Sequence, residues 1–177
     1  MIEVYGFSEP DCKRATHPCQ CGYFGDAVHE CTCTPPLIQR YLARVSGPLL
    51  DRIDLHIQVP AVKYKELAED GKSEESAVVR ERILSARHKQ CKRLEAFGIY
   101  CNAQMTPRTL RRFCKLDSES EKQMENAITR LGLSARAYDR ILRVSRTMAD
   151  LENTDSIQGR HVAEAIQYRA LDRTYWQ

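Results

Sequence analysis

The sequence predicts a mainly α-helical fold, in which a helical domain follows a smaller segment with a cysteine-rich loop, one helix and one strand. Two observations carry this prediction. From about residue 62 onward, apolar residues recur at spacings of three and four, the period of an amphipathic helix. Before that point, apolar and polar residues alternate clearly only over residues 55–59. We therefore predict two domains, residues 1–62 and residues 63–177.

The first 34 residues are rich in glycine, proline, cysteine and aspartate and show no sustained periodicity. This composition predicts a loop that needs an external staple. Thr34 before Pro35 and Pro36 predicts a helix start, because threonine can cap a helix and proline is tolerated in the first turn. Apolar residues then follow at helical spacing: Leu37, Ile38, Tyr41, Leu42 and Val45.

Gly47 and Pro48 are expected to break this helix. Apolar side chains alternate with polar ones after the break, which is the period-2 pattern of a short strand. The apolar members of this strand are Leu55, Ile57 and Val59.

The second domain is predicted to consist of successive amphipathic helices. The first covers residues 79–97 and ends at Gly98. Later helices are expected at 106–115, 119–131, 134–151 and 159–170, with N-caps at Thr106, Ser118 and Ser134. The predicted core of the protein comprises Leu49, Leu50, Leu55, Ile57, Ile141, Leu142, Val162 and Ile166.

Composition excludes some classes of protein. Hydrophobic residues make up 42% and charged residues 29%, which excludes an intrinsically disordered chain of low hydrophobicity. The net charge of +3 is too small to identify a partner. The sequence contains neither an apolar run of about 18 residues, as a membrane span needs, nor a signal peptide, so we expect a cytoplasmic protein without membrane contact.

Eight cysteines in a reducing compartment are considered first as metal ligands. Two Cys-x-Cys pairs lie close together in the sequence, and four thiolates suit the tetrahedral shell of structural zinc. They are Cys19, Cys21, Cys31 and Cys33. The alternative is four free or redox-active thiols, because a single intervening residue strains capture by both cysteines of a pair.

Two histidines, His17 and His29, are near enough in the sequence to replace a cysteine as ligands. The remaining cysteines are predicted to be small core residues or surface thiols. These are Cys12, Cys91, Cys101 and Cys114.

The stretch from Ser46 to Asp54 predicts a tight turn with one arginine, Arg52, between two carboxylates just before the strand. Taken alone, such an arginine is more often a surface ion-pair residue. Three further arginines fall on one face of a predicted helix, where a solvated basic surface is the usual explanation. These are Arg136, Arg140 and Arg143.

Four segments in this order resemble the Mg-chelatase-like AAA+ ATPase family of the ComM and YifB type. They are Pro18–Tyr23, Cys31–Cys33, Ser46–His56 and Leu133–Tyr138. The resemblance covers roughly residues 15–170. It implies that the chain is the C-terminal part of such an ATPase, with a remnant of an α/β core before an α-helical lid.

The resemblance also implies residue roles. The Leu-Leu-Asp-Arg segment is similar to the arginine-finger segment of MCM helicases and magnesium chelatases, so Arg52 would act in trans as the finger. A guanidinium from a neighbouring subunit neutralises charge on the transferred γ-phosphoryl group. Arg136 matches the sensor-2 arginine, which would touch the γ-phosphate from the lid. The implied partners are the AAA+ core domain, neighbouring subunits of a ring expected to be hexameric, and DNA.

The sequence departs from the family pattern at the nucleotide site. His17 stands at the sensor-1 position, where the family has asparagine. No G-x-x-x-x-G-K-S/T phosphate-binding loop occurs, since the segment ending in Gly71-Lys72-Ser73 has Glu66 where glycine is required. No apolar strand ends in paired acids that would hold Mg²⁺. We therefore expect this chain alone not to hydrolyse ATP, its ATP and Mg²⁺ site being completed by an upstream domain.

Two functions from different classes follow. The first is part of a ring motor that acts on DNA, as in branch migration during competence. The alternative is a non-catalytic, zinc-stapled helical module that binds nucleic acid or protein. A basic helix face supports the alternative: Arg82, Lys89, Lys92 and Arg93. A third possibility, metal insertion, rests only on the family name.

Overall fold

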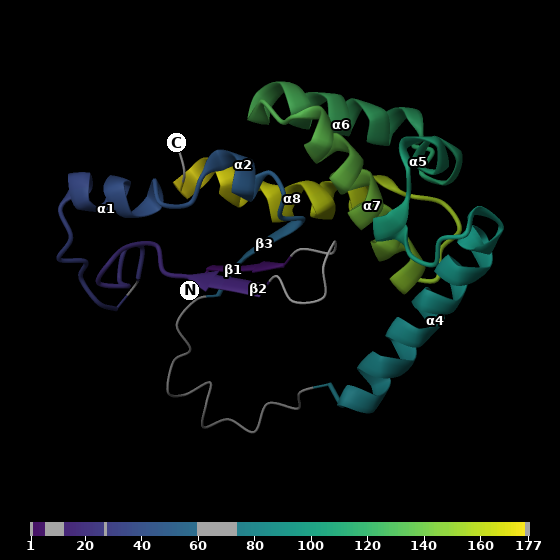
Figure 1. Ribbon diagram of the computed structural model, residues 1–177, viewed down its shortest axis with the longest axis horizontal. Coiled ribbons are helices and arrows are strands. Elements are labelled where there is room, and N and C mark those ends of the chain that lie inside the picture. Colours follow the sequence, from purple (N-terminus) through teal and green to yellow (C-terminus); the bar gives the residue numbers. More distant parts are fainter. Residues whose placement is uncertain (1, 6–12, 27, 60–73, 176–177) are drawn as a thin grey trace. The chain divides into compact units, whose positions relative to one another are not determined.

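A computed structural model of the chain describes residues 2–5, 13–26, 28–59 and 74–175 (Figure 1). The chain separates into two compact units. The first comprises Met1–Lys72 and Tyr168–Gln177, and the second comprises Ser73–Gln167. The predicted boundary at residues 62 and 63 lies outside the described residues. The prediction of a mainly helical fold is confirmed.

The first unit contains a small antiparallel sheet of three strands in the order β2-β1-β3 (Figure 1). The strands are β1 Ile2–Tyr5, β2 Lys13–Thr16 and β3 Leu55–Gln58. Ile2 of the central strand stands opposite Thr16 on one side and Gln58 on the other. The predicted strand is β3. The other two strands are of the same length but lie in the first 34 residues, where the sequence shows no sustained periodicity.

Two short helices precede β3. Helix α1, Pro35–Leu42, begins where predicted, and Thr34 has the extended backbone of an N-cap (φ −71°, ψ 151°). Its side chain makes no capping hydrogen bond, so the predicted hydroxyl cap is wrong. Helix α2, Gly47–Leu50, occupies the predicted break. Pro48 fits there because the first helical turn needs no N–H donor.

The second unit consists of helices. Helix α4, Ser76–Leu94, continues as the 3₁₀ helix η1, Glu95–Phe97, and ends at Gly98 in the left-handed conformation (φ 67°), as predicted. The 3₁₀ helix η2 spans Asn102–Gln104. The other helices are α5 Pro107–Phe113, α6 Ser118–Leu131, α7 Ala135–Leu151 and α8 Gly159–Tyr175, and α8 extends into the first unit.

Side-chain caps explain why three of these helices begin where they do. Thr106 and Ser134 accept hydrogen bonds from the N–H groups of Thr109 and Ala137, as predicted for N-caps. The cap of α6 is Asp117, whose carboxylate accepts from the Ser120 N–H at 2.7 Å. The prediction of Ser118 is therefore wrong by one residue, because Ser118 is already helical.

Helix α7 is the centre of the second unit, and α4, α5 and η2 pack against it. Its buried apolar residues are Ala137, Ile141, Leu142, Val144 and Ala149. Of the predicted core, four side chains are buried: Leu50, Ile141, Leu142 and Val162. The other four are half-buried: Leu49, Leu55, Ile57 and Ile166.

A buried ionic network closes this core. The Asp150 carboxylate is fully buried and pairs with two arginines, Arg93 of α4 and Arg146 of α7. Asn102 of η2 donates to the same carboxylate at 2.9 Å. The Arg146 guanidinium also donates to the backbone oxygens of Asp155 at 2.6 Å and Thr154 at 2.7 Å. The network therefore joins α4, η2, α7 and the loop after α7.

We expect Asp150→Ala to destabilise the protein by about 3–5 kcal/mol, because the charges of two arginines would lose their buried carboxylate partner. Urea unfolding followed by circular dichroism measures the effect. Glu125→Ala on α6 is the control, since Glu125 is exposed and should change stability by less than about 0.5 kcal/mol. Equal unfolding midpoints for the two variants would contradict a structural role of the network.

Candidate metal centre and arginine positions

The four predicted cysteines form one cluster, which we call the cysteine cluster: Cys19, Cys21, Cys31 and Cys33. All four sulfur atoms lie within 4.8 Å of one another. The Sγ–Sγ distances are 3.3 Å for Cys19–Cys21, 3.7 Å for Cys19–Cys31 and 3.5 Å for Cys21–Cys31. A tetrahedron with Zn–S bonds of about 2.3 Å has edges of about 3.8 Å. The cluster thus fits a metal ion with four thiolate ligands.

A left-handed glycine allows the short Cys-x-Cys spacing. The Gly22 N–H donates to the Cys19 carbonyl oxygen at 3.2 Å, and Gly22 has φ +88°. This turn brings Cys21 back toward Cys19, and the Phe24 N–H donates to the Cys19 sulfur at 3.3 Å. A Cβ atom at Gly22 would stand 3.5 Å from the His17 ring. That is an ordinary van der Waals distance, so glycine is favoured here by the left-handed backbone and not by lack of space.

The histidines are not part of the cluster, since the four potential ligands that lie together among the described residues are all cysteines. The His29 ring instead lies 4.8 Å from the Tyr23 ring and 3.5 Å from the Asp26 carboxylate. His17 is exposed and lies beside Gly22. The hypothesis that His17 or His29 replaces a cysteine is therefore not needed to complete a ligand set of four.

The thiols of the cluster affect one another's ionisation. A hydrogen bond from the Tyr23 backbone N–H, aided by bonds from the neighbouring thiols, lowers the pKa of Cys21 to about 6. The backbone N–H of Cys33 lowers the pKa of Cys31, but desolvation and the thiols of Cys21 and Cys19 outweigh it and raise this pKa to about 12. One thiolate therefore opposes the ionisation of the next. A bound cation would supply the charge that four thiolates together require.

The other described cysteines lie apart from the cluster. Cys114 is buried, and burial raises the pKa of its thiol to about 12, so it is an inert core residue as predicted. Cys91 and Cys101 are half-buried, and the Cys91 thiol donates to the Tyr100 carbonyl oxygen at 3.4 Å. Cys12 lies outside the described residues, as does the Gly71–Ser73 segment.

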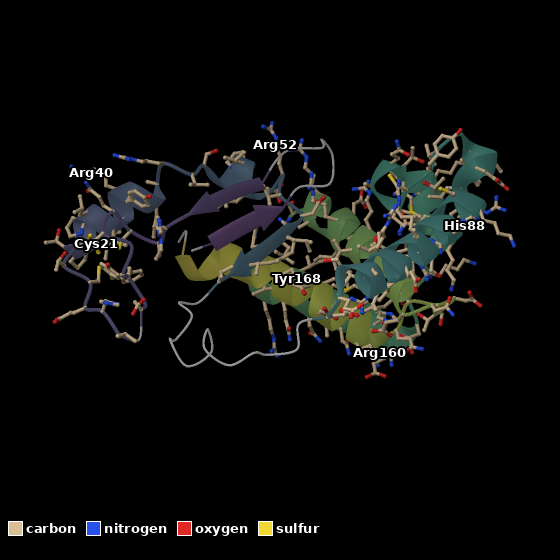
Figure 2. All side chains as sticks on the ribbon, turned by 90° about the horizontal axis from the view of Figure 1, so that it is seen from below. Cys21, Arg40, Arg52, His88, Arg160 and Tyr168 are labelled. Atoms are coloured by element: carbon tan, nitrogen blue, oxygen red, sulfur yellow. The ribbon has the colours of Figure 1, made fainter. Side chains whose placement is uncertain are left out.

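Arg52 lies on the turn between α2 and β3. The Arg52 N–H donates to the Leu49 carbonyl oxygen and the Ile53 N–H to the Leu50 carbonyl oxygen, each at 3.0 Å. Leu50 and Ile53 are buried on either side of the exposed Arg52. The turn is therefore anchored by two apolar side chains, while the Arg52 side chain extends away from the ribbon (Figure 2).

Arg169 of α8 is a residue that sequence reasoning missed. Its side chain is 1% exposed, and its guanidinium donates to the backbone oxygen of Ile53. It also lies 3.5 Å from the Asp51 carboxylate. Arg169 thus holds the residues before and after Arg52, within the first unit. The only sequence signal was a basic residue in a predicted amphipathic helix, and many solvated arginines show the same signal.

Arg136 is exposed in the first turn of α7, in the second unit. The other two arginines of the predicted basic face differ from it. Arg140 is half-buried, and the Arg143 guanidinium donates to the Met105 carbonyl oxygen at 2.9 Å. A solvated basic surface therefore describes Arg136 but not Arg143, because Arg143 joins α7 to the residues before α5.

The basic face predicted on α4 is also altered by the fold. Arg82 pairs with Glu74 at 3.1 Å, and Arg93 is part of the Asp150 network. Lys89 is half-buried and Lys92 is exposed. Two of the four cations are thus neutralised by carboxylates, so this face is a weaker candidate for binding an anionic partner than the sequence indicated.

Two family descriptions together match nearly all of the chain after residue 10. The family described as "Magnesium chelatase, subunit ChlI" matches residues 11–67. The family described as "Magnesium chelatase, subunit ChlI C-terminal" matches residues 73–169, more than half of the chain. The chain belongs to the magnesium chelatase ChlI family. The first match contains the cysteine cluster and Arg52, and the second contains Arg136.

Individual relatives agree with this assignment. The chain is 42% identical to the uncharacterized protein YifB of Escherichia coli over 142 residues, which are 80% of this chain and 27% of YifB. It is 42% identical to the competence protein ComM of Haemophilus influenzae over 160 residues, which are 90% of this chain and 30% of ComM. An uncharacterized protein of Mycobacterium tuberculosis (strain H37Rv) is 35% identical over 156 residues. The chain thus spans less than a third of the relatives it matches.

A membrane-spanning helix is not found within the part of the chain that the structure describes, because no helix there is both long and apolar enough.

Proposed function

We propose that this chain supplies the arginine finger and the sensor-2 arginine to the ATP site of a Mg-chelatase-like ring motor that acts on DNA. In this proposal Arg52 acts in trans on the nucleotide of a neighbouring subunit, and Arg136 acts from the lid. The P-loop and the acids that hold Mg²⁺ come from the AAA+ core domain. Family membership and the presentation of Arg52 support the proposal.

The presentation of Arg52 is the observation that carries it. A finger must reach a phosphate on another subunit, so its guanidinium has to be exposed while its backbone stays fixed. Arg52 is exposed, and its neighbours Leu50 and Ile53 are buried. Arg169 binds the Ile53 carbonyl oxygen from within the core. An ordinary surface arginine needs no such support on both sides of its backbone.

The second arginine lies on a different unit. Arg136 is exposed at the start of α7, and α7 is the packing centre of the second unit. A guanidinium there would sense the γ-phosphate when the lid closes and release it after hydrolysis. His17, which stands at the sensor-1 position, is exposed beside the cysteine loop. A neutral imidazole there could still hydrogen-bond a water molecule or a phosphate.

The cysteine cluster is proposed to hold Zn²⁺ as a structural ion. The donor set of four thiolates and the measured sulfur spacing match what structural zinc prefers. The ion would close the loop of residues 19–33, which otherwise has few buried apolar side chains. Such a closed loop fixes the residues that lead into α1. It supplies stability, not catalysis, because no position is left open for substrate.

DNA is proposed as the polymer on which the motor acts. The support is the relative ComM of Haemophilus influenzae, which is named as a competence protein. A trans-acting finger requires two subunits at each ATP site, and a closed ring would let every subunit both bind ATP and supply a finger. A non-catalytic zinc-stapled module remains the alternative, and it is favoured by the independent core of the second unit.

A graft tests the proposal. The matching segment of Haemophilus influenzae ComM is replaced by this chain, and ATP hydrolysis is compared with that of ComM lacking the segment. We expect the graft to restore hydrolysis, because it returns both arginines to a P-loop domain. A graft that folds and assembles but hydrolyses ATP no faster than the truncated protein would favour the non-catalytic module.

A further inference from the structure

Helix α5 has an exposed basic face that neither the proposed ATP site nor the cysteine cluster uses. We call it the α5 basic face. It consists of Arg108, Arg111 and Arg112 of the helix, together with Lys115 just after it. Arg108, Arg111 and Arg112 are related by i, i+3 and i+4, so they share one side of the helix, and Lys115 directly follows the C-cap residue Cys114. The opposite side is buried through Thr109, Leu110 and Cys114.

The cations of this face have no carboxylate partner in the part of the chain that the structure describes. Between residues 105 and 116 the sequence contains no aspartate or glutamate. Among the residues that the structure describes, none forms an ion pair with any of the four side chains. Two other exposed arginines of the same unit have carboxylate partners: Arg82 pairs with Glu74, and Arg160 with Glu152 at 2.6 Å. The α5 basic face differs in its density of charge, because it places four cations in residues 108–115 with no acidic residue among them.

Local helix energetics do not explain the face. Arg111 and Arg112 lie in the last turn, where a helix dipole favours cations. Arg108 lies in the first turn, where the dipole opposes a positive charge. Like charges three and four residues apart also repel each other. The isolated helix would therefore be more stable without Arg108, and a bound anion would relieve the repulsion.

One member of the face is held in place by aromatic rings. The Arg112 guanidinium lies 5.4 Å from the ring centroids of both Phe97 and Phe113. The two rings meet edge to face at 5.7 Å. This arrangement fixes the flat cation at the surface before any partner arrives, which lowers the entropy lost on binding.

We propose that the α5 basic face binds the phosphate backbone of nucleic acid without sequence preference. Side chains three and four residues apart on a helix stand about 5–6 Å from one another, so several can contact one sugar-phosphate strand. Arginine suits this contact because its guanidinium forms paired hydrogen bonds with phosphate. The inference rests on the proposed action on DNA and identifies the surface that makes the contact.

Fluorescence anisotropy of labelled 20-mers, single-stranded and duplex, tests the proposal with the whole 177-residue chain. Binding is measured between roughly 50 and 200 mM salt. The test variant is Arg108→Glu with Arg111→Glu and Lys115→Glu, which keeps the Arg112 ring contacts. The matched control is Arg80→Glu with Lys122→Glu and Arg130→Glu, three exposed cations elsewhere that give the same net charge.

We expect the test variant to weaken binding at least tenfold relative to the control. The slope of log K against log salt should fall by about 0.9 for each lost phosphate contact on duplex DNA. A second variant, with glutamine at the same three positions, should weaken binding in the same direction, and circular dichroism verifies that it folds. Equal weakening by the control, or wild-type binding that is independent of salt, would overturn the proposal.

Two further comparisons separate related outcomes. If polyglutamate displaces the DNA as effectively as unlabelled DNA of equal charge, the face recognises acidic protein instead and the proposal fails. In the ComM graft, the test variant should leave ATP hydrolysis without DNA unchanged. If the graft with the wild-type segment binds DNA but does not hydrolyse ATP, the proposed motor function fails while the proposed DNA-binding surface stands.

Discussion

Arg52→Ala in the ComM graft is expected to reduce kcat for ATP hydrolysis by roughly 1,000- to 100,000-fold, the range by which arginine fingers accelerate phosphoryl transfer. The affinity for ATP should change little, because the finger acts on charge that develops in the transition state. The measurement is steady-state phosphate release by the assembled graft. The expected loss of activity follows from the exposed position of Arg52 on an anchored turn.

Arg40→Ala is the matched control, since Arg40 is an exposed arginine of the same unit, on α1. It should leave the rate nearly unchanged. Mixing experiments then test whether Arg52 acts in trans. Arg52→Ala subunits keep a working P-loop, so mixing them with P-loop-defective subunits that keep Arg52 should restore part of the activity. An unaffected rate would rule out the finger, and a loss that mixing does not rescue would assign Arg52 to its own subunit.

Zinc content is the second quantity for which we expect a large effect. The wild-type chain should bind one zinc ion, and Cys19→Ser should lose it, because Cys19 is the buried member of a four-thiolate set. Loss of the ion should open the loop of residues 19–33 to protease cleavage and hydrogen exchange. Metal analysis after dialysis measures the first effect, and limited proteolysis with mass spectrometry measures the second.

Cys91→Ser is the control for the zinc experiment. Cys91 is half-buried on α4 and lies outside the cysteine cluster, so its replacement should leave both zinc content and loop protection unchanged. The metal assignment would be contradicted by wild-type protein that stays free of zinc after reconstitution. Equal zinc loss in the two variants would show that the effect is not specific to the cluster.

Helix positions were predictable because their signals are local. The glycine at position 98 and the caps at Thr106 and Ser134 act within a few residues, and the structure reproduces each of them. The apolar stripe predicted the helix α4 but not the burial of all its members, because Ile83 and Phe97 are exposed. The cysteine cluster was predictable for a related reason. Two Cys-x-Cys pairs separated by nine residues can meet through one short loop, whatever the rest of the fold does.

Strands β1 and β2 could not be predicted in this way. Strand β1 pairs with β2 on one side and with β3 on the other, and Ile2 of β1 stands opposite Gln58 of β3, far along the chain. A single strand has no favourable free energy of its own, because its hydrogen bonds are made to another segment. The pairing is therefore a property of the folded unit, not of the segment.

The same reason limits what the sequence says about charged residues. By itself, the sequence determined the helices, the cysteine motif and the family resemblance, since each depends on local spacing. It could not distinguish Arg93, which pairs with Asp150 57 residues away, from Arg52, which is exposed. Arg169 likewise reaches a turn 116 residues earlier in the chain. Only the tertiary structure decided which arginines are buried with a partner in the core and which are exposed at the surface, because electrostatic and desolvation energies depend on distance and burial in space.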